Sequence, residues 1–216
     1  MNKNLTEMVF ILDRSGSMSH LEADTIGGYN SLLEQQKKEE GEAVVTTVLF
    51  DDKYELVHDR ADIKKVSPLT DREYFARGLT ALLDAIGKTV NHIKERHKYA
   101  PDGELPGKTV VVIITDGFEN ASSEFTKSQI KSLIESQKEE CGWEFLFLGA
   151  NIDAVSTARD YGIACDRAVK YEADNIGTMI NFAAVSKTVS CVREEKPISP
   201  AWKKDIEAHL KKKKGK

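Results

Sequence analysis

The feature that most constrains this chain is a fully apolar run near its middle. Five β-branched residues stand in succession from Val110 to Ile114, and they predict a strand over residues 109–115. A strand that is apolar at every position is buried on both faces, as in parallel sheets covered by helices on either side. The rest of the chain must therefore supply neighbouring strands and the helices that cover them.

Strand and helix patterns alternate along the rest of the sequence. Further strands are predicted over residues 8–12, 44–50, 54–58, 143–148 and 168–171. Apolar residues at helical spacing separate them, over residues 26–33, 82–93, 130–134, 154–161 and 176–192. Asp51 and Asp52 predict a turn, which makes residues 54–58 an antiparallel edge strand. Right-handed crossovers then give a three-layer, doubly wound α/β fold, Rossmann-like, with a mostly parallel central sheet and helices on both faces.

The domain organisation follows from length and from two prolines. A chain of 216 residues favours one domain, predicted here over residues 1–195. Pro197 and Pro200 separate a C-terminal extension, residues 196–216, which contains a short amphipathic helix over 202–210 and a basic tail over 211–214. The helix is expected to dock on the protein's own body, with docking to a partner as the alternative. The tail is interpreted as a solvated charge run.

The composition of the chain indicates which partners are not expected and in which compartment the protein is expected. The net charge is −4, so there is no general positive field and nucleic acid is not expected as a partner. No apolar stretch is long enough for a signal peptide or a bilayer span, so a membrane role is not expected either. The three cysteines are far apart, which argues against a disulfide framework or a zinc site and for buried or half-buried thiols. We therefore expect a cytoplasmic protein.

Polar residues stand where two strands end and where the longest helix begins. The sequence Asp-Arg-Ser-Gly-Ser occupies positions 13–17, Thr-Asp-Gly occupies positions 115–117, and a threonine at position 80 precedes the helix over 82–93. Ligands of open α/β sheets bind at the carboxyl ends of the strands. If the first strand and the strand over 109–115 are neighbours, these side chains converge on one point. The candidate metal ligands are Asp13, Ser15, Ser17, Thr80 and Asp116.

The chemistry of this set is uniform, because every member offers oxygen. Oxygen-only sites suit hard cations such as magnesium, manganese or calcium. Two carboxylates balance a divalent charge, and three neutral hydroxyls leave the ion electrophilic. An open coordination position would then attract a carboxylate from another molecule. No residue is assigned to catalysis, and no organic cofactor is expected.

The same residues carry a resemblance to a known family. The pattern Asp-x-Ser-x-Ser, a downstream threonine and an aspartate ending a buried strand resemble the metal-ion-dependent adhesion site of von Willebrand factor type A domains. The resemblance extends over residues 7 to 195. It implies that Ser15, Ser17 and Thr80 ligate the metal directly, whereas Asp13 and Asp116 are ligands or water-bridged anchors.

The resemblance also implies a function. Members of the family bind proteins through a glutamate or aspartate that completes the coordination of a divalent cation, with magnesium the expected metal here. This chain resembles an intracellular bacterial or phage-like member. The resemblance implies a non-catalytic subunit or adaptor of an intracellular assembly, such as an ATPase or stress-response complex.

Two other functions stay open at this stage. A metal-dependent hydrolase could act on phosphate or acyl groups, since magnesium in an open site polarises such groups. Enzymes with an aspartyl nucleophile, however, carry a second acidic residue where this chain has Ser15. A small-anion or nucleotide sensor is the other alternative. His20 could act as a base but is interpreted as a solvent-facing residue, and Phe118 is equally compatible with a partner contact and with a place under its own loop.

Overall fold

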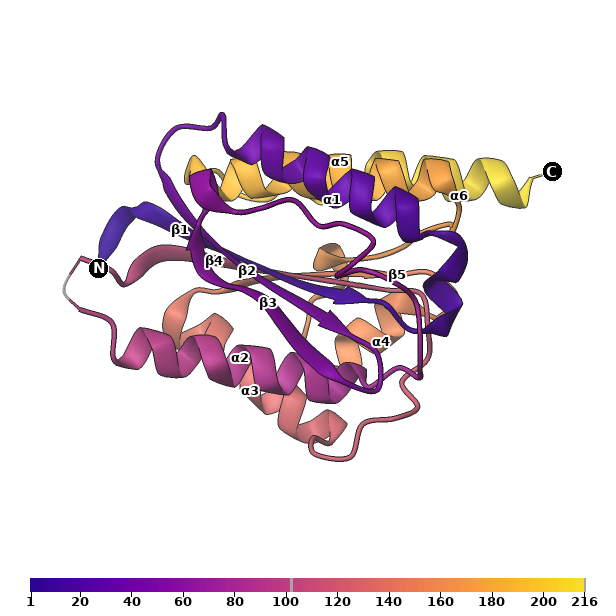
Figure 1. The fold of residues 1–216 in the computed structure, drawn as a ribbon, viewed down its shortest axis with the longest axis horizontal. Helices are drawn as coiled ribbons and strands as arrows, with labels where there is room; N and C mark the ends of the chain where they lie inside the picture. Colours follow the sequence, from indigo (N-terminus) through magenta and orange to yellow (C-terminus); the bar gives the residue numbers. More distant parts are fainter. Residues whose placement is uncertain (102, 216) are drawn as a thin grey trace.

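The computed structural model describes residues 1–101 and 103–215 and has a six-stranded sheet at its centre (Figure 1). The strand order is β3-β2-β1-β4-β5-β6. The strands are β1 (Asn2–Asp13), β2 (Glu42–Phe50), β3 (Tyr54–Asp62), β4 (Pro106–Thr115), β5 (Glu144–Gly149) and β6 (Ala168–Lys170). β1 pairs in parallel with β2 and β4, while β3 is antiparallel to β2 at the edge. The predicted mostly parallel sheet with one antiparallel edge strand is confirmed.

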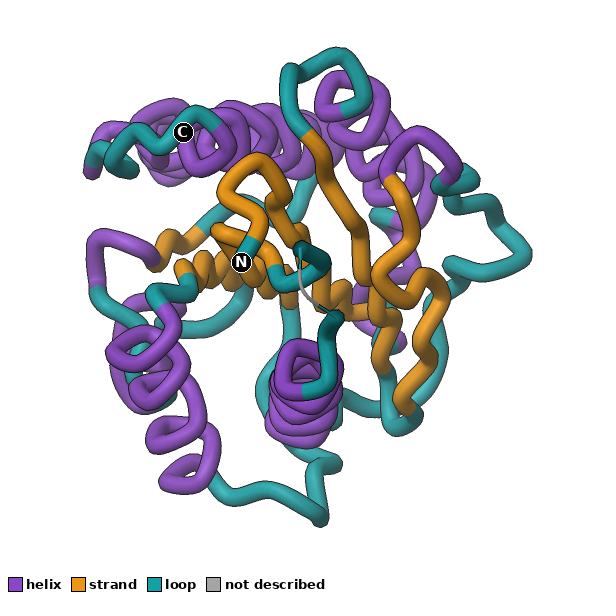
Figure 2. Tube along the Cα trace, turned by 90° about the vertical axis from the view of Figure 1, so that its left-hand side faces the viewer, coloured by secondary structure: helices purple, strands orange, loops and turns teal. Residues whose placement is uncertain are grey.

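Helices cover both faces of this sheet (Figures 1 and 2). One face carries α1 (Glu22–Gln36), α5 (Asn175–Arg193) and α6 (Lys204–Lys214), and the other carries α2 (Leu82–Lys98), α3 (Lys127–Cys141) and α4 (Ala154–Asp160). Short 3-10 turns are η1 (Gly16–His20), η2 (Ile63–Lys65), η3 (Cys165–Arg167) and η4 (Pro200–Lys203). The three-layer arrangement predicted from the alternating patterns is therefore present.

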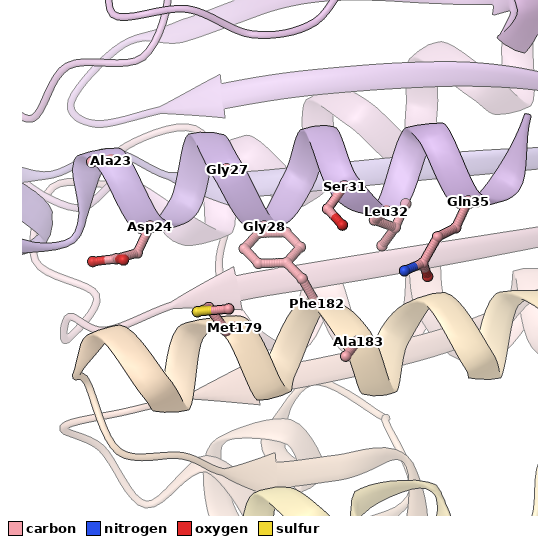
Figure 3. A pocket seen from close by; sticks show the side chains of 10 residues that line it. All are labelled: Ala23, Asp24, Gly27, Gly28, Ser31, Leu32, Gln35, Met179, Phe182 and Ala183. Atoms are coloured by element: carbon pink, nitrogen blue, oxygen red, sulfur yellow. The ribbon is translucent and has the colours of Figure 1, made fainter.

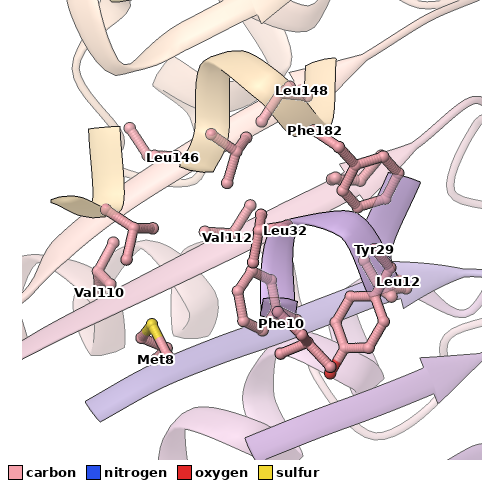
Figure 4. Close-up of a cluster of buried hydrophobic side chains, with 14 of the residues drawn as sticks. Met8, Phe10, Leu12, Tyr29, Leu32, Val110, Val112, Leu146, Leu148 and Phe182 are labelled. Atoms are coloured by element: carbon pink, nitrogen blue, oxygen red, sulfur yellow. The ribbon is translucent and has the colours of Figure 1, made fainter. Parts of the chain in front are cut away.

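The strand side chains divide between two cores by simple alternation. Met8, Phe10 and Leu12 of β1 belong to the core beneath α1 and α5, where Figure 4 shows Phe10 and Leu12 close to Tyr29. The intervening residues of β1 face α2, α3 and α4 on the other side. Because alternate side chains of a strand point to opposite faces of the sheet, one apolar run packs against both helix layers. Packing on both faces holds β1 in place, and this also fixes where the loop after β1 begins.

β1 is longer than predicted, because it begins with a mainly polar stretch in which only the last residues, including Glu7, are buried. Glu7 is fully buried, and its Oε2 lies 2.6 Å from His97 Nε2 and 3.2 Å from Arg60 Nε. The apolar pattern starts only at Met8, so it missed a stretch whose side chains are neutralised by partners distant in sequence. The cysteine prediction was wrong in part, since Cys141 and Cys165 are exposed.

None of the helices in the described part of the chain is both long enough and apolar enough to span a bilayer.

The C-terminal extension packs on the protein's own body. Ile206 of α6 is buried, and the Trp202 indole N–H donates to the Asp166 carbonyl at 2.7 Å. α6 lies against α5 and β6. The expected docking of this helix is therefore seen, while the boundary at residue 195 stays a prediction and residue 216 of the extension lies outside the described residues.

The four lysines of the basic tail are exposed, in agreement with a solvated charge run, but α6 continues through them to Lys214 and one of them is paired. Lys213 Nζ lies 2.7 Å from Asp174 Oδ2, and His209 Nε2 lies 3.0 Å from Asp174 Oδ1. Burial alone would raise the pKa of Asp174, but hydrogen bonds from Lys213, the Gly177 N–H and His209 together lower it to about 2. Asp174 also caps the first turn of α5, so one carboxylate joins α5 to α6.

We expect Ile206→Ala to destabilise the whole domain, because the buried side chain belongs to the core that α1 and α5 share with the sheet. The loss should be about 3 kcal/mol in urea unfolding, as for other buried isoleucines. The matched control Lys211→Ala, on the exposed side of the same helix, should stay within about 0.5 kcal/mol. Equal effects of the two changes would show that α6 is only loosely attached.

Candidate metal site

The pairing of β1 with β4 brings the two predicted carboxylates to one edge of the sheet. Leu12 is opposite Ile114 in the parallel ladder, so Asp13 and Asp116 leave the sheet side by side. Both side chains are almost fully buried, at 1% exposure. Their neighbourhood therefore has to supply the hydrogen bonds or the positive charge that water would otherwise give.

Hydroxyl groups connect these carboxylates. Asp13 accepts from the Ser15 N–H at 2.7 Å and from the Thr115 hydroxyl at 2.5 Å. The Ser15 and Ser17 hydroxyl oxygens are 3.1 Å apart, and Ser17 donates to Asp116 Oδ1 at 2.5 Å. Four of the predicted residues are thus joined in one continuous chain of hydrogen bonds.

Thr80 joins the same cluster from a loop. A Cβ added to Gly117 would lie 2.8 Å from Thr80 Oγ1 and 3.5 Å from Ser17 Oγ, so both hydroxyls meet at that glycine. α2 begins only at Leu82, with Ala81 at its N-cap, so Thr80 is not the cap. All five predicted residues are therefore brought together, and their role as ligands stays a prediction.

The cluster fits a cation of the predicted kind. Asp116 Oδ2 is buried and has no hydrogen-bond partner. Burial raises the pKa of Asp13 to about 6 and raises the pKa of Asp116 above its usual value. Within residues 1–101 and 103–215, no three His, Cys, Asp or Glu side chains group as a metal site, so hydroxyl oxygens would have to complete the coordination. A hard divalent ion accepts such a set.

A buried ion-pair network, which the sequence did not predict, lies directly behind this cluster. Arg14 is fully buried, with Nε 3.1 Å from Asp51 Oδ2 and Nη2 2.7 Å from Glu55 Oε2. Arg77 Nε lies 2.6 Å from the same Asp51 oxygen. Burial alone would raise the pKa of Asp51, but Arg77 and Arg14 hold it below its usual value. Asp51 was interpreted as a turn residue, and it does accept the Lys53 N–H, but it is also the anchor of two arginines.

Backbone hydrogen bonds tie the Thr80 loop to the turn after β1. The Gly16 N–H donates to the Gly78 carbonyl at 3.2 Å, and the Ala81 N–H donates to the Asp51 carbonyl at 2.9 Å. Gly78 has a φ of +67°, and a Cβ there would lie 2.0 Å from Asp52 Oδ1. Only glycine fits this close approach without strain. The loop is therefore held to β1 and β2 at several points.

A second brace connects Thr80 to the loop after β4. The Thr80 N–H donates to Asn120 Oδ1 at 2.9 Å, and the Asn120 N–H donates back to the Thr80 carbonyl at 3.1 Å. Glu119 accepts the Leu83 N–H at 2.9 Å and the Ser122 N–H at 2.8 Å, which holds the loop to the start of α2. Asn120 and Glu119 escaped the sequence analysis, although both stand within four residues of Asp116.

Two residues that the sequence left open are now placed. His20 is exposed and its ring contacts the Ala173 carbonyl at 3.2 Å, in agreement with the solvent-facing interpretation. Phe118 is 67% exposed, so it does not lie under its own loop.

Solved structures with the same architecture identify the fold. Over 88% of this chain, a von Willebrand factor type A protein from Catenulispora acidiphila matches with a TM-score of 0.55 and 15% identity. The chain has the fold of a von Willebrand factor type A domain. Proximal thread matrix protein 1 from the mussel byssus, whose metal-ion-dependent adhesion site is occupied by zinc, matches over 88% with a TM-score of 0.59 and 16% identity. The conserved hypothetical protein BatB from Bacteroides thetaiotaomicron matches over 88% with a TM-score of 0.54 and 14% identity.

The share of each neighbour's own chain that the match covers differs among these structures. This chain covers 47% of the mussel protein and 43% of the Catenulispora protein, so it spans less than half of each. It covers 99% of the BatB chain. No protein-family model and no curated protein matches the sequence. The type A fold is thus shown by structure, at sequence identities that carry the fold alone.

We expect Asn120→Ala to weaken magnesium or manganese binding by about tenfold, since residues that orient metal ligands have effects of this size. The matched control Asn120→Asp keeps an acceptor for the Thr80 N–H and should retain most of the affinity. Isothermal titration of chelator-treated protein measures both. Equal affinities for wild type and Asn120→Ala would show that Thr80 needs no such support.

Metal affinity should also depend on pH in a defined direction. Because the metal-free pKa of Asp13 is about 6, the carboxyl is ionised above that pH and protonated below it. An incoming cation must displace the proton at lower pH, so the affinity should fall by up to about tenfold per pH unit below 6. Titrations at pH 5.0, 6.0 and 7.5 measure this dependence. An affinity that is the same at pH 5.0 and 7.5 would contradict the placement of Asp13 at the cation.

Proposed function

We propose that this type A domain is a non-catalytic, metal-dependent protein-binding module. It holds one divalent cation at the cluster of Asp13, Ser15, Ser17, Thr80 and Asp116 and captures an acidic group of a partner protein. The observation that carries the proposal is the unpartnered, buried Oδ2 of Asp116, whose other oxygen accepts from Ser17 and whose neighbour Gly117 lies against the hydroxyls of Ser17 and Thr80.

Each residue of the cluster has a distinct task in this proposal. Ser15, Ser17 and Thr80 offer neutral oxygens to the cation, and Asp13 and Asp116 supply the charge, directly or through water. A bound divalent cation supplies an electrophilic position that a carboxylate of the partner can complete. Ser17 is exposed, whereas the other four residues of the cluster are buried, so the open position lies beside Ser17.

The comparisons support the binding of a divalent cation but do not give its identity. The mussel protein has zinc at its adhesion site. We propose magnesium for this chain, with manganese or calcium as substitutes, because the ligand set contains oxygen only. The exposed thiols of Cys141 and Cys165 support a reducing compartment, in line with a cytoplasmic module in an intracellular assembly such as an ATPase or stress-response complex.

The alternative of a metal-dependent hydrolase requires a base or nucleophile at the cation. The histidine next to the cluster in sequence, His20, directs its ring to the Ala173 carbonyl. Asp13, the residue in the position of an aspartyl nucleophile, is buried and accepts hydrogen bonds from Ser15 and Thr115. These contacts favour the binding module over the enzyme.

The decisive test compares Thr80→Ala with Thr80→Ser. Thr80→Ala should melt close to wild type in chelator, and it should lose most of the rise in melting temperature that magnesium or manganese gives to the wild type by mass action. Thr80→Ser keeps the hydroxyl and should retain that rise, while Asp116→Ala should abolish it. Scanning calorimetry with and without chelator measures all four proteins.

The same variants separate the two functions. If wild-type protein hydrolysed p-nitrophenyl phosphate or acetate in magnesium and Thr80→Ala did not, the hydrolase alternative would be correct. If Thr80→Ala kept the full response to metal, the cation would bind elsewhere.

A further inference from the structure

Large exposed apolar side chains gather at the edge of the sheet that carries the metal cluster. Seven such side chains are exposed in the described part of the chain: Met1, Phe75, Leu79, Tyr99, Phe118, Ile176 and Met179. All but Met1 and Tyr99 belong to segments at the carboxyl edge. Scattered exposed apolar residues need no explanation, but a group of them around one site marks an interaction surface.

Four of the five side chains at this edge are more than half exposed, and we refer to them as the apolar rim: Leu79, Phe118, Ile176 and Met179. Leu79 precedes Thr80 in the chain, and Phe118 follows Asp116 by two residues. Ile176 and Met179 belong to the first turns of α5, which follows Ala173, the residue that His20 contacts. The rim therefore has two members next to cluster residues in the chain and two at the start of α5, which the His20 contact joins to the turn after β1.

The rim is held in place by the braces that position the ligands. The reciprocal hydrogen bonds between Thr80 and Asn120 fix the backbone beside Leu79 and Phe118. Asp174 caps α5 just before Ile176 and is itself paired with Lys213 of α6. Side chains on such fixed segments lose little freedom when a partner covers them, so their apolar area is available for binding.

Met179 extends the rim into a groove between α1 and α5. The groove has a volume of about 380 Å³, and Figure 3 shows Met179 at the same end as Asp24, with Phe182 and Gly27 further along. The Phe182 ring packs against Gly28, where a Cβ would lie 2.3 Å from the ring, and Gly27 is open, with nothing within 4 Å of its Cβ position. The surface beside Met179 is thus hollowed, and its lining combines the apolar Leu32, Met179 and Phe182 with the polar Asp24, Ser31 and Gln35.

We propose that the partner of this module is a peptide segment in which the acidic residue is flanked by large apolar side chains. This inference rests on the proposed function. The carboxylate complements the charge of the cation, and its apolar neighbours cover Leu79 and Phe118 next to the cluster residues and Ile176 and Met179 at the start of α5. A single carboxylate on an exposed cation competes with water, so the apolar rim supplies the affinity and the selection among acidic segments.

The test uses random twelve-residue peptides displayed on phage, selected on the full chain loaded with manganese and eluted with chelator. We expect the enriched peptides to share an aspartate or glutamate with bulky apolar residues within three positions. Peptides whose acid is flanked by polar or basic residues would overturn the proposal, as would enrichment of peptides that bind without metal.

The rim is then tested with one synthetic enriched peptide. Leu79→Ser, Phe118→Ser and Met179→Ser should each weaken its binding by about tenfold in fluorescence titrations, the size expected for an apolar contact at the centre of an interface. Tyr99→Ser, which removes an equally exposed ring at the opposite edge, should leave the affinity within about twofold. Melting temperatures of the variants should match wild type, because all four side chains are exposed.

Failure of this inference is distinguishable from failure of the proposed function. If calorimetry shows no manganese binding to wild type, the metal-dependent function itself is wrong. If manganese binds and Asp116→Ala abolishes it, but no peptide is enriched or the rim variants bind the peptide like wild type, only the apolar partner is wrong. Concentration-dependent dimerisation lost in Phe118→Ser would assign the rim to a second copy of this chain and overturn the peptide proposal.

Discussion

The parallel pairing of β1 with β4 is the interaction on which the rest of this structure depends. It joins two strands that lie about ninety positions apart in the sequence through a register that sets Leu12 against Ile114. Both strands are buried from above and below, so neither can shift along the other without moving apolar side chains out of two cores. The carboxylates at the ends of these strands are therefore fixed in position by two strands that are buried on both faces.

The loops at this edge are ordered by polar contacts of a different kind. Arg14 lies inside the Asp-x-Ser-x-Ser sequence, yet its side chain turns away from the hydroxyls to Asp51 and Glu55. Removing one partner of such a buried pair leaves an uncompensated charge, which is far more costly than the pair itself is stabilising. Asp51 also pairs with Arg77, which lies in the loop that carries Thr80. The ion pairs of Asp51 therefore act mainly as a constraint on the position of that loop.

The sequence predicted the parts of the structure that depend on local patterns. The apolar runs and their alternation with helices were sufficient for the layers, the parallel sheet and the antiparallel edge, and the spacing of oxygen-bearing residues was sufficient to nominate one cluster. The polar start of β1 was missed because its buried carboxylate, Glu7, is paired with His97 and Arg60, residues far away in the chain. The pairs Arg14–Asp51 and Thr80–Asn120 were missed for the same reason, since each depends on the path of a loop.

The reciprocal hydrogen bonds between Thr80 and Asn120 have a mechanical consequence. They join the loop before α2 to the loop after β4, while Gly16 and Gly78 join that same loop to the turn after β1. A pull on anything held at the cluster is therefore divided among three segments before it reaches the sheet. The force is then transmitted along β1 and β4, and the hydrogen-bond ladders with β2 and β5 carry part of it to those strands. A load applied at one point is in this way shared by the four strands β2, β1, β4 and β5 at the centre of the sheet.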